Sequence, residues 1–140
     1  MEHVVVVGAG QAGAALVAKL RAEGYAGRLT LIGEEHAPPY QRPPLSKKYL
    51  LGEMELERLY LRPESFYAEN GIELLRDTTA VSIDRAGGRV IADGAALPYD
   101  ALALCTGAVP RRLPGAIGGE LPGAIGGELP GVHVVRTLAA

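Results

Sequence analysis

Apolar positions form two short runs near the start of the chain, and both are typical of strands that are buried on both faces. The first run is four consecutive valines at residues 4–7. β-branched residues in so short a run favour a strand of a parallel sheet over a helix. The second run, RLTLIG at residues 28–33, ends immediately before Glu34. The pattern therefore predicts two parallel strands at the beginning of an α/β domain.

Between these runs the apolar positions change to a helical spacing. Ala12, Leu16 and Leu20 recur at intervals of four, which predicts a helix over about residues 11–23 with these side chains as its buried stripe. Gly24 stands where a glycine commonly ends a helix. The order strand, helix, strand is typical of a Rossmann-type nucleotide-binding unit.

The connection between the first strand and the helix has the spacing GxGxxG, at Gly8, Gly10 and Gly13. The first glycine permits a tight turn, the second lets the backbone approach a pyrophosphate, and the third allows close helix–sheet packing. The free N–H groups of the helix then point at the phosphates. Glu34 would accept hydrogen bonds from both ribose hydroxyls of an adenosine and would repel a 2′-phosphate, while Glu35 either reaches the adenosine or is solvated. These residues predict a site for FAD or NAD, not NADP; the alternative is a glycine-rich turn in an unrelated α/β domain.

The rest of the chain is divided by prolines and by a change of period. Four prolines at positions 38, 39, 43 and 44 exclude regular structure up to Ser46, which caps a short helix starting at Lys47. An extended piece at residues 59–61 precedes a helix from Pro63 to about Asn70. The further strands that we expect lie at residues 72–75, 80–84, 89–92 and 97–98, as a small antiparallel meander, and at residues 100–106 and 132–135. The strand at 100–106 is apolar enough to be buried.

An octapeptide repeat separates the last two strands. LPGAIGGE occupies residues 113–120 and again 121–128, and LPG follows at 129–131. No repeat of eight residues has a face large enough to bury, which excludes a solenoid. The segment is either a functional mobile loop or a duplication tolerated in an exposed connection, and we favour the duplication.

Composition limits the partners that the chain can have. With 140 residues and 48% apolar content it is large enough for one domain with its own core. A net charge of −2 with scattered basic residues argues against a nucleic acid or an anionic membrane. No stretch is long and apolar enough to span a bilayer. Glu2 stands where a signal peptide would have a positive charge, and we expect a cytoplasmic protein.

Few residues of the chain are candidates for thiol or metal chemistry. Cys105 is the only cysteine, which excludes an internal disulfide or a paired-cysteine redox motif and suits a reducing compartment. We interpret it as a buried thiol. His3, His36 and His133 are isolated from other ligand types, so no metal site is predicted.

Taken together, these motifs resemble the FAD-dependent ferredoxin and rubredoxin reductases, the putidaredoxin reductase-like group of the pyridine-nucleotide disulfide oxidoreductase superfamily. The resemblance rests on VVVVGAGQAG, LIGEE, PYQRPPLSKKYL, LYLRP, ALCTGAVPRRLP and VHVVRTL. It implies an α/β fold, with a Rossmann-like FAD-binding domain that has a parallel central sheet and a small antiparallel β-meander and is incomplete. Residues 1–112 would be the N-terminal part of that domain, 113–131 the duplicated loop, and 132–140 a terminal strand and a segment close to FAD.

The resemblance also implies which residues bind FAD. They are Gly8, Gly10, Ala12, Gly13, Glu34, Glu35, Arg42, Lys47, Val81, Thr106, Gly107 and Arg136. Val81 would meet the adenine through its backbone, although it could equally be a plain core residue. Lys47 would lie near the flavin N5, where a cation on a stiff loop stabilises the negative charge that develops on reduction. The alternative is that Arg42 and Lys47 are ordinary surface cations, as we expect for Lys48, Arg111 and Arg112.

The function implied by the resemblance is electron transfer. Hydride would pass from NAD(P)H to FAD, and single electrons would pass on to a ferredoxin- or rubredoxin-type iron–sulfur protein, because the redox disulfide of the wider superfamily is absent. The chain matches only the first part of the family's length and lacks the second GxGxxG of the nicotinamide domain. We therefore expect weak FAD binding and no catalysis by this chain alone. The alternative is a non-catalytic FAD- or NAD-binding or interaction module.

Overall fold

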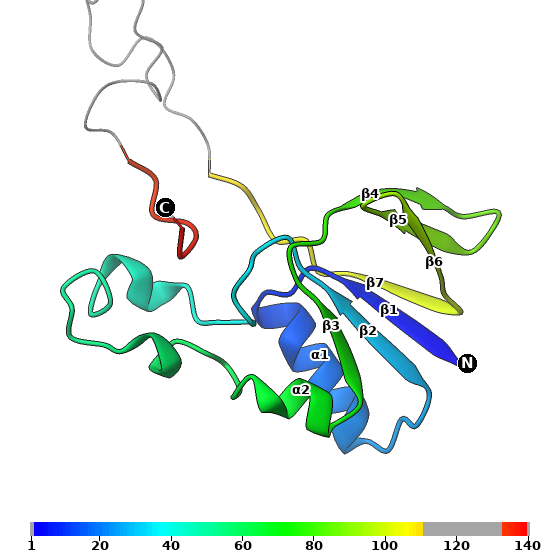
Figure 1. Cartoon of the computed structure of the whole chain (residues 1–140), viewed down its shortest axis with the longest axis horizontal. Helices are drawn as coiled ribbons and strands as arrows, with labels where there is room; N and C mark the ends of the chain where they lie inside the picture. Colours follow the sequence, from blue (N-terminus) through cyan, green and yellow to red (C-terminus); the bar gives the residue numbers. More distant parts are fainter. Residues whose placement is uncertain (1, 111–132, 140) are drawn as a thin grey trace, which may run out of the picture. The chain divides into compact units, whose positions relative to one another are not determined.

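The computed structural model describes residues 2–110 and 133–139, and the chain divides into two units, 1–107 and 108–140. The helices and strands of the described residues belong to the first unit (Figure 1). In chain order they are β1 His3–Val7, α1 Gln11–Ala22, β2 Arg28–Ile32, η1 Pro43–Ser46, η2 Leu56–Arg58, α2 Ser65–Glu69, β3 Ile72–Leu75, β4 Ala80–Asp84, β5 Arg89–Ala92, β6 Ala95–Pro98 and β7 Ala101–Leu104, where η marks a 3-10 helix. No helix in this described part is long and apolar enough to cross a membrane.

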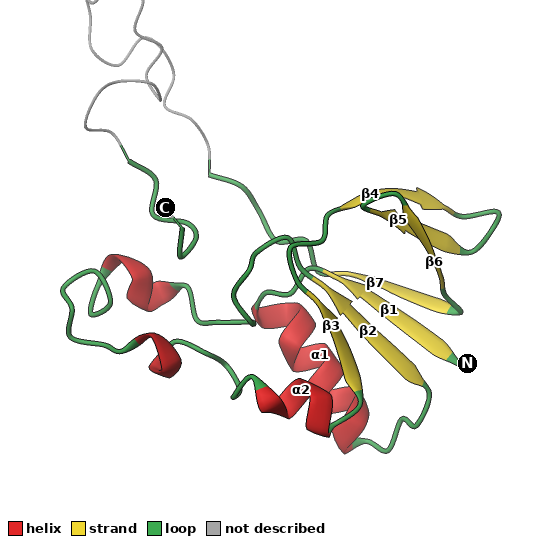
Figure 2. Ribbon diagram, in the orientation of Figure 1, coloured by secondary structure: helices red, strands yellow, loops and turns green. Residues whose placement is uncertain are grey.

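A parallel sheet with the strand order β3-β2-β1-β7 forms the centre of the first unit. The valine run of β1 is buried along its whole length, as predicted, because β2 and β7 flank it and both faces are covered. α1 and α2 lie on one side of this sheet and the three-stranded sheet β4-β5-β6 lies beyond its other side (Figure 2). The prediction of a Rossmann-like α/β fold is confirmed.

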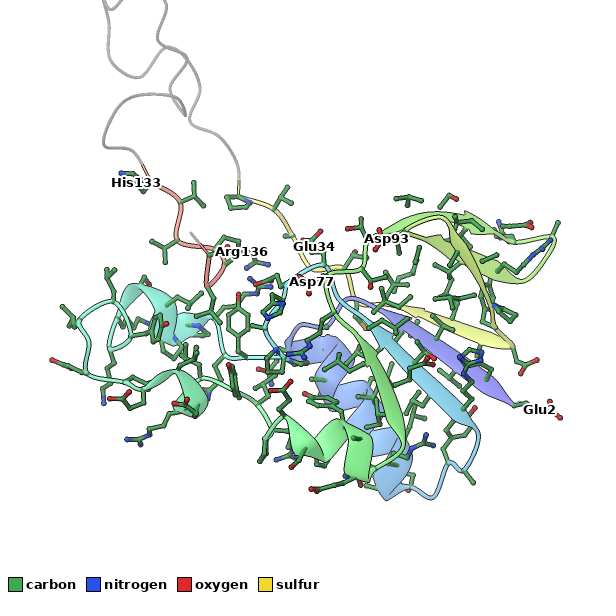
Figure 3. All side chains as sticks on the ribbon, in the orientation of Figure 1. Glu2, Glu34, Asp77, Asp93, His133 and Arg136 are labelled. Carbon is green, nitrogen blue, oxygen red and sulfur yellow. The ribbon has the colours of Figure 1, made fainter. Side chains whose placement is uncertain are left out.

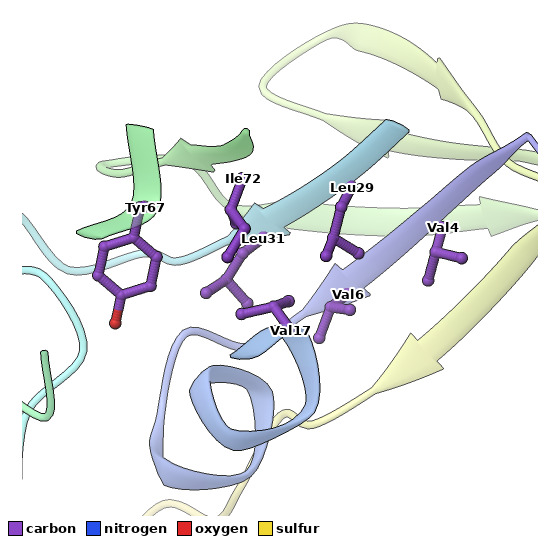
Figure 4. Packing of buried hydrophobic residues seen from close by; sticks show 7 residues of the cluster. All are labelled: Val4, Val6, Val17, Leu29, Leu31, Tyr67 and Ile72. Carbon is purple, nitrogen blue, oxygen red and sulfur yellow. The ribbon is translucent and has the colours of Figure 1, made fainter. Parts of the chain in front are cut away.

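The alternation of side chains along β1 builds two separate cores. Val4 and Val6 pack against α1 and α2, in a cluster with Val17 and Tyr67 (Figure 4). The intervening valines of β1 point to the opposite face and pack against the buried residues of β5. Because side chains of a strand point alternately to its two faces, one apolar run holds both layers together.

The buried stripe of α1 differs from the predicted one. Gly13, Ala14 and Val17 are buried, Leu16 and Leu20 are half-buried, and the alanine at position 12 is exposed. A side chain at Gly13 would overlap the carbonyl oxygen of the glycine turn and crowd a leucine of β2, so the helix approaches the sheet most closely at this residue. The line of closest approach therefore runs through positions 13 and 17, and the buried face is rotated by about one residue.

The strand at Ile72–Leu75 was predicted to begin the antiparallel meander, and this prediction is wrong. β3 pairs with β2 in parallel and extends the central sheet, while the meander consists of β4, β5 and β6 alone. The short helix α2 packs against β3 and provides the crossover that a parallel connection requires. A run of four apolar-rich residues carries no mark of strand direction, so the sequence pattern alone could not separate the two pairings.

The two turns of the meander contain Gly87–Gly88 and Asp93–Gly94. Asp93 and Gly94 both have positive φ, 45° and 80°, which is the conformation of a two-residue hairpin whose twist matches its strands. β6 is longer than expected and begins at Ala95. β7, in contrast, is shorter and less buried than expected: it pairs only with β1 among the described strands, and Leu104 is 60% exposed.

The proline segment forms helical structure earlier than predicted. A 3-10 helix occupies Pro43–Ser46, and hydrogen-bonded turns follow it through Gly52 in place of the predicted helix from Lys47. Both prolines stand in the first turn, where their missing N–H groups would have no partner inside the helix.

The second unit is described at residues 108–110 and 133–139 only, and neither range contains a helix or a strand. The terminal strand predicted at 132–135 is not formed over residues 133–135, because no described residue pairs with them. The duplicated loop at 113–131, together with Arg111, Arg112 and Val132, lies outside the described residues.

Candidate dinucleotide-binding site

The carboxyl ends of β1, β2 and β7 meet at one edge of the central sheet. Gly8 follows β1 and donates its N–H to Ile32 at the end of β2 (2.8 Å), and Cys105 follows β7 and donates to Val7 (2.7 Å). In open α/β sheets ligands bind outside this edge of the strands. The structure therefore brings the glycine turn, the start of α1, Glu34 and the segment after β7 to the place where such a fold binds its ligand.

The glycine turn has the conformation that its spacing predicts. Gly8 has a φ of 110°, and a side chain there would overlap the carbonyl oxygen of Cys105, so only glycine fits between β1 and the end of β7. Gly10 caps the N-terminus of α1, and a Cβ added to it would meet no atom within 4 Å. Ala12 is exposed in the first turn of this helix, which contains no acidic residue. The open space at Gly10 adjoins backbone N–H groups that attract an anion.

Glu34 lies at the same edge with its side chain exposed (Figure 3). Its position is fixed by Gly33, where an added Cβ would collide with the Cβ of Ala9 in the glycine turn. Within the described part of the chain its carboxylate has no hydrogen bond or ion pair. This carboxylate lies next to a glycine turn of the kind that binds phosphate, and it accepts no hydrogen bond from the described protein. Both features suit its predicted role, which is to accept hydrogen bonds from ribose hydroxyls.

Glu35 is half-buried and paired, so the expectation that it is simply solvated is wrong, while its contact with an adenosine stays a prediction. Its Oε2 accepts a hydrogen bond of 2.5 Å from the hydroxyl of Tyr40, and its Oε1 accepts one of 2.6 Å from Nη2 of Arg42. Arg42 also donates from Nη1 to the Tyr40 hydroxyl (3.3 Å), and its guanidinium carbon lies 5.2 Å from the centre of the Tyr40 ring. Arg42 is therefore not a freely solvated surface cation.

Lys47 ends the 3-10 helix of the proline segment. Its backbone N–H donates to Pro44 (2.9 Å), which anchors the main chain, and its side chain is exposed, as is that of Lys48. The anchored backbone and exposed ammonium are compatible with contact to a bound ligand. The predicted role of Lys47 near a flavin stays a prediction.

Val81 does not belong to the core, so the core alternative is wrong. Its side chain is 66% exposed on β4, and the pairing register of β4 with β5 shifts between Ala80 and Ser82. Val81 is thus the extra residue of a β-bulge and has no partner in the register. Bulges leave local backbone groups outside the ladder, as a residue that recognises adenine through its backbone would require.

Thr106 and Gly107 follow β7 and are both exposed, and Gly107 has a φ of 69°. Arg136 belongs to the second unit and is half-buried. The structure sets these residues in their local environments, and their contacts with a cofactor stay predictions.

The residues that hold the β3–β4 connection were not predicted from the sequence. Asp77 has a φ of 51°, and the backbone N–H of Thr78 donates to Gly33 (3.0 Å). The carboxylate of Asp93 accepts from the N–H of Thr79 (3.2 Å), which ties the hairpin turn to this connection. Aspartate adopts this left-handed conformation more readily than most residues, and at Asp93 it belongs to the hairpin turn between β5 and β6. The sequence signal was the Asp–Gly turn, but nothing in it indicated a contact with residue 79.

His36, which was expected to be isolated from other ligand types, has its Nδ1 within hydrogen-bond distance of Oδ2 of Asp77 (2.8 Å). Both side chains are well exposed. No group of three potential metal ligands lies together within the described ranges.

The amino ends of the same strands carry a different kind of polar cluster. The ring of His3 contacts the hydroxyl of Thr30 (2.8 Å), this hydroxyl donates to Glu73 (2.8 Å), and Glu73 pairs with Arg28 (2.9 Å). Burial, together with the charge of Arg28, lowers the pKa of His3. Burial raises the pKa of Glu73, but the hydrogen bonds from Thr30 and Arg28 outweigh it and leave that pKa lowered.

Asp100 anchors the beginning of β1 at this same end. It accepts the backbone N–H groups of His3 and Glu2, each at 2.8 Å, and these bonds lower its pKa. The polar groups at the amino ends are thus satisfied by the protein, whereas Glu34 and the start of α1 at the carboxyl ends are open.

The fold is of the Rossmann type, and this edge is where proteins of that type bind a dinucleotide. The chain belongs to the pyridine nucleotide-disulphide oxidoreductase family, which matches residues 2–139. The resemblance inferred from the sequence is therefore confirmed.

The curated relatives are named as reductases of small electron carriers. The chain is 47% identical over 117 residues to the probable ferredoxin reductase CtmF of Castellaniella defragrans, covering 81% of this chain and 29% of that protein. It is 46% identical over 114 residues to putidaredoxin reductase CamA of Pseudomonas putida, covering 81% of this chain and 27% of that one. The chain thus spans less than a third of the length of these relatives.

Solved structures agree with this family. The ferredoxin reductase for the CYP199A2 system from Rhodopseudomonas palustris matches with a TM-score of 0.84 at 40% identity, covering 99% of this chain and 32% of that one. The reductase in the covalent putidaredoxin reductase–putidaredoxin complex matches with a TM-score of 0.79 at 46% identity, covering 84% and 28%.

Proposed function

We propose that this chain forms the FAD-binding portion of an NAD(P)H-dependent flavoprotein reductase that passes electrons to a ferredoxin- or rubredoxin-type iron–sulfur protein. One observation carries the FAD site: the open N-terminus of α1 at Gly10 lies at the same sheet edge as Glu34, whose carboxylate accepts nothing from the described protein. The relatives named as ferredoxin and rubredoxin reductases support the choice of acceptor. Residues 1–112 would be the N-terminal part of the FAD-binding domain, in a cytoplasmic protein.

The residues present fit FAD by their chemistry. The N–H groups at the start of α1 suit the diphosphate, Glu34 suits the ribose hydroxyls, and the bulge at Val81 suits the adenine edge. When bound, FAD supplies the conversion between two-electron and one-electron transfer, which these side chains do not perform. The cation of Lys47 would stabilise negative charge on the reduced ring.

Titration of the chain with FAD and with NAD tests this proposal. We expect quenching of flavin fluorescence and a rise in melting temperature with FAD, and a smaller rise with NAD. Glu34→Gln should weaken FAD binding about tenfold, the effect of losing charge-assisted hydrogen bonds. Glu53→Gln is the matched control, since Glu53 is an exposed carboxylate of the turn that follows the proline segment.

Stronger stabilisation by NAD than by FAD would contradict the flavin proposal and favour a non-catalytic nucleotide-binding module. We also expect no NADH-dependent reduction of an electron acceptor by this chain alone. Such activity would show that the chain contains more of the catalytic machinery than we propose.

A further inference from the structure

The segment between Pro39 and Lys47, here called the proline loop, is held to the rest of the unit by buried side chains and by hydrogen bonds of its backbone and side chains. Its backbone is bonded to the chain near Leu59: Gln41 donates to Leu59 and Leu61 donates to Pro39, each at 2.9 Å. Its side chains are bonded to Glu35 through the Tyr40 hydroxyl and the Arg42 guanidinium. The backbone bonds hold the loop to another loop. The bonds to Glu35 connect it to the end of β2.

Glu35 and Glu34 are neighbours with opposite environments. Both carboxylate oxygens of Glu35 already accept hydrogen bonds from the proline loop, and the side chain is only 23% exposed. Glu34 is exposed and accepts nothing from described residues. Two adjacent carboxylates next to a diphosphate would repel it, but Arg42 neutralises one of them. The two acids therefore have different tasks, and only one is placed to touch the ligand.

We infer that Glu35 is a positioning residue of the FAD site: it holds Arg42 and, with Tyr40, fixes the proline loop to the end of β2. Arg42 and Lys47 are thereby kept at the edge where Glu34 lies. This inference rests on the proposed FAD site, and it assigns the ordering of the loop to an acid that makes no contact with FAD. A guanidinium that donates from Nη2 to Glu35 and from Nη1 to the Tyr40 hydroxyl is well suited to this task because its geometry is rigid.

The substitution Glu35→Gln separates positioning from simple electrostatics, because the two predict opposite signs. Removal of a negative charge near a diphosphate would by Coulomb's law tighten FAD binding. Loss of the bonds that order Arg42 and the loop should instead weaken it, by about tenfold. Flavin fluorescence titration of the full chain measures the difference.

Two further variants keep the test open if Glu35→Gln alone folds poorly. Arg42→Lys keeps the charge but loses the planar fork, and it should weaken FAD binding nearly as much as Glu35→Gln. Tyr40→Phe keeps the buried ring and removes one bond to Glu35, and it should cause a smaller loss. Full FAD affinity in Arg42→Lys would overturn the inference.

Glu73→Gln is the matched control. Like Glu35, Glu73 pairs with an arginine: its Oε2 lies 2.9 Å from Nη2 of Arg28. This pair joins β3 to β2 at the amino end of the sheet. Its loss should lower the melting temperature and leave FAD affinity unchanged. Weakened FAD binding in this control as well would mean that the effect of Glu35 is general destabilisation and would overturn the inference.

Amide hydrogen exchange distinguishes a failure of this inference from a failure of the proposed function. Without any ligand, Glu35→Gln should accelerate exchange at Gln41 and Leu61, whose N–H groups bond across the base of the proline loop. Unchanged exchange would overturn the inference, even if wild-type binds FAD. Wild-type that binds no FAD would instead refute the proposed function, while the exchange rates would still decide whether Glu35 fixes the loop.

Discussion

The same substitution at two glycines of the turn should have opposite consequences. In Gly10→Ala the new methyl group enters space with no atom within 4 Å, and the backbone φ of −90° is accessible to any residue. Alanine is a poorer N-cap than glycine but restricts the unfolded chain, so the free energy of unfolding should stay within about 1 kcal/mol of wild-type. FAD affinity should fall at least about tenfold, or about 1.4 kcal/mol, because the methyl occupies the space through which the backbone approaches the diphosphate.

Gly8→Ala should instead damage the fold. The φ of 110° costs a residue with a side chain about 1–2 kcal/mol. The methyl group also overlaps the carbonyl oxygen of Cys105, so the end of β7 must move. Together these effects should lower the free energy of unfolding by about 3 kcal/mol.

Urea unfolding followed by circular dichroism measures the two stabilities, since the chain has no tryptophan to report them. Flavin fluorescence titration measures the two affinities. Wild-type affinity in Gly10→Ala would refute the assignment of the diphosphate to this turn. Equal losses of stability in both variants would refute the claim that Gly10 faces open space.

Two further predictions concern stability. Tyr67 is buried, its hydroxyl has no partner among the described residues, and burial raises its pKa to about 12. Tyr67→Phe should therefore leave the free energy of unfolding unchanged or raise it by up to about 1 kcal/mol. A clear loss of stability in urea unfolding would show that the hydroxyl is bonded. The pKa of His3 is lowered from its ordinary value of 6.5, so the native state binds the His3 proton less tightly than the unfolded state does. The free energy of unfolding should therefore fall as the pH drops below about 6.5. His3→Gln should reduce the slope of unfolding free energy against pH, measured by urea titrations between pH 7 and 5. A slope that is the same in His3→Gln would assign it to other groups.

Local features of this fold were predictable because their causes are local. Four valines followed by glycines at the observed spacing specify strand, turn and helix through backbone conformation alone. The parallel pairing of β3 was not predictable, because strand direction depends on where α2 packs and four residues carry no sign of it. The buried face of α1 was displaced for a similar reason: the close approach at Gly13 depends on the turn that precedes it.

The candidate site divides in the same way. Gly8, Gly10 and Glu34 follow from sequence spacing, whereas the pairing of Glu35 with Arg42 spans seven residues and a proline loop, with no periodicity to reveal it. The bulge at Val81 likewise arises from a register shift between two strands. A sequence pattern identifies residues that act through their own backbone, but it does not show which side chains meet across a loop.

The two ends of the central sheet differ in how their polar groups are satisfied, and this difference supports the location of the site. At the amino ends His3, Thr30, Glu73 and Asp100 all have protein partners. At the carboxyl ends Glu34 accepts nothing from described residues, and the start of α1 faces open space. Exposed donors and acceptors at this edge leave room for a ligand to bond there, at the place where such a sheet binds its ligand. Substitutions at the amino ends should therefore change stability without changing FAD affinity, and Gly10→Ala or Glu34→Gln should do the reverse.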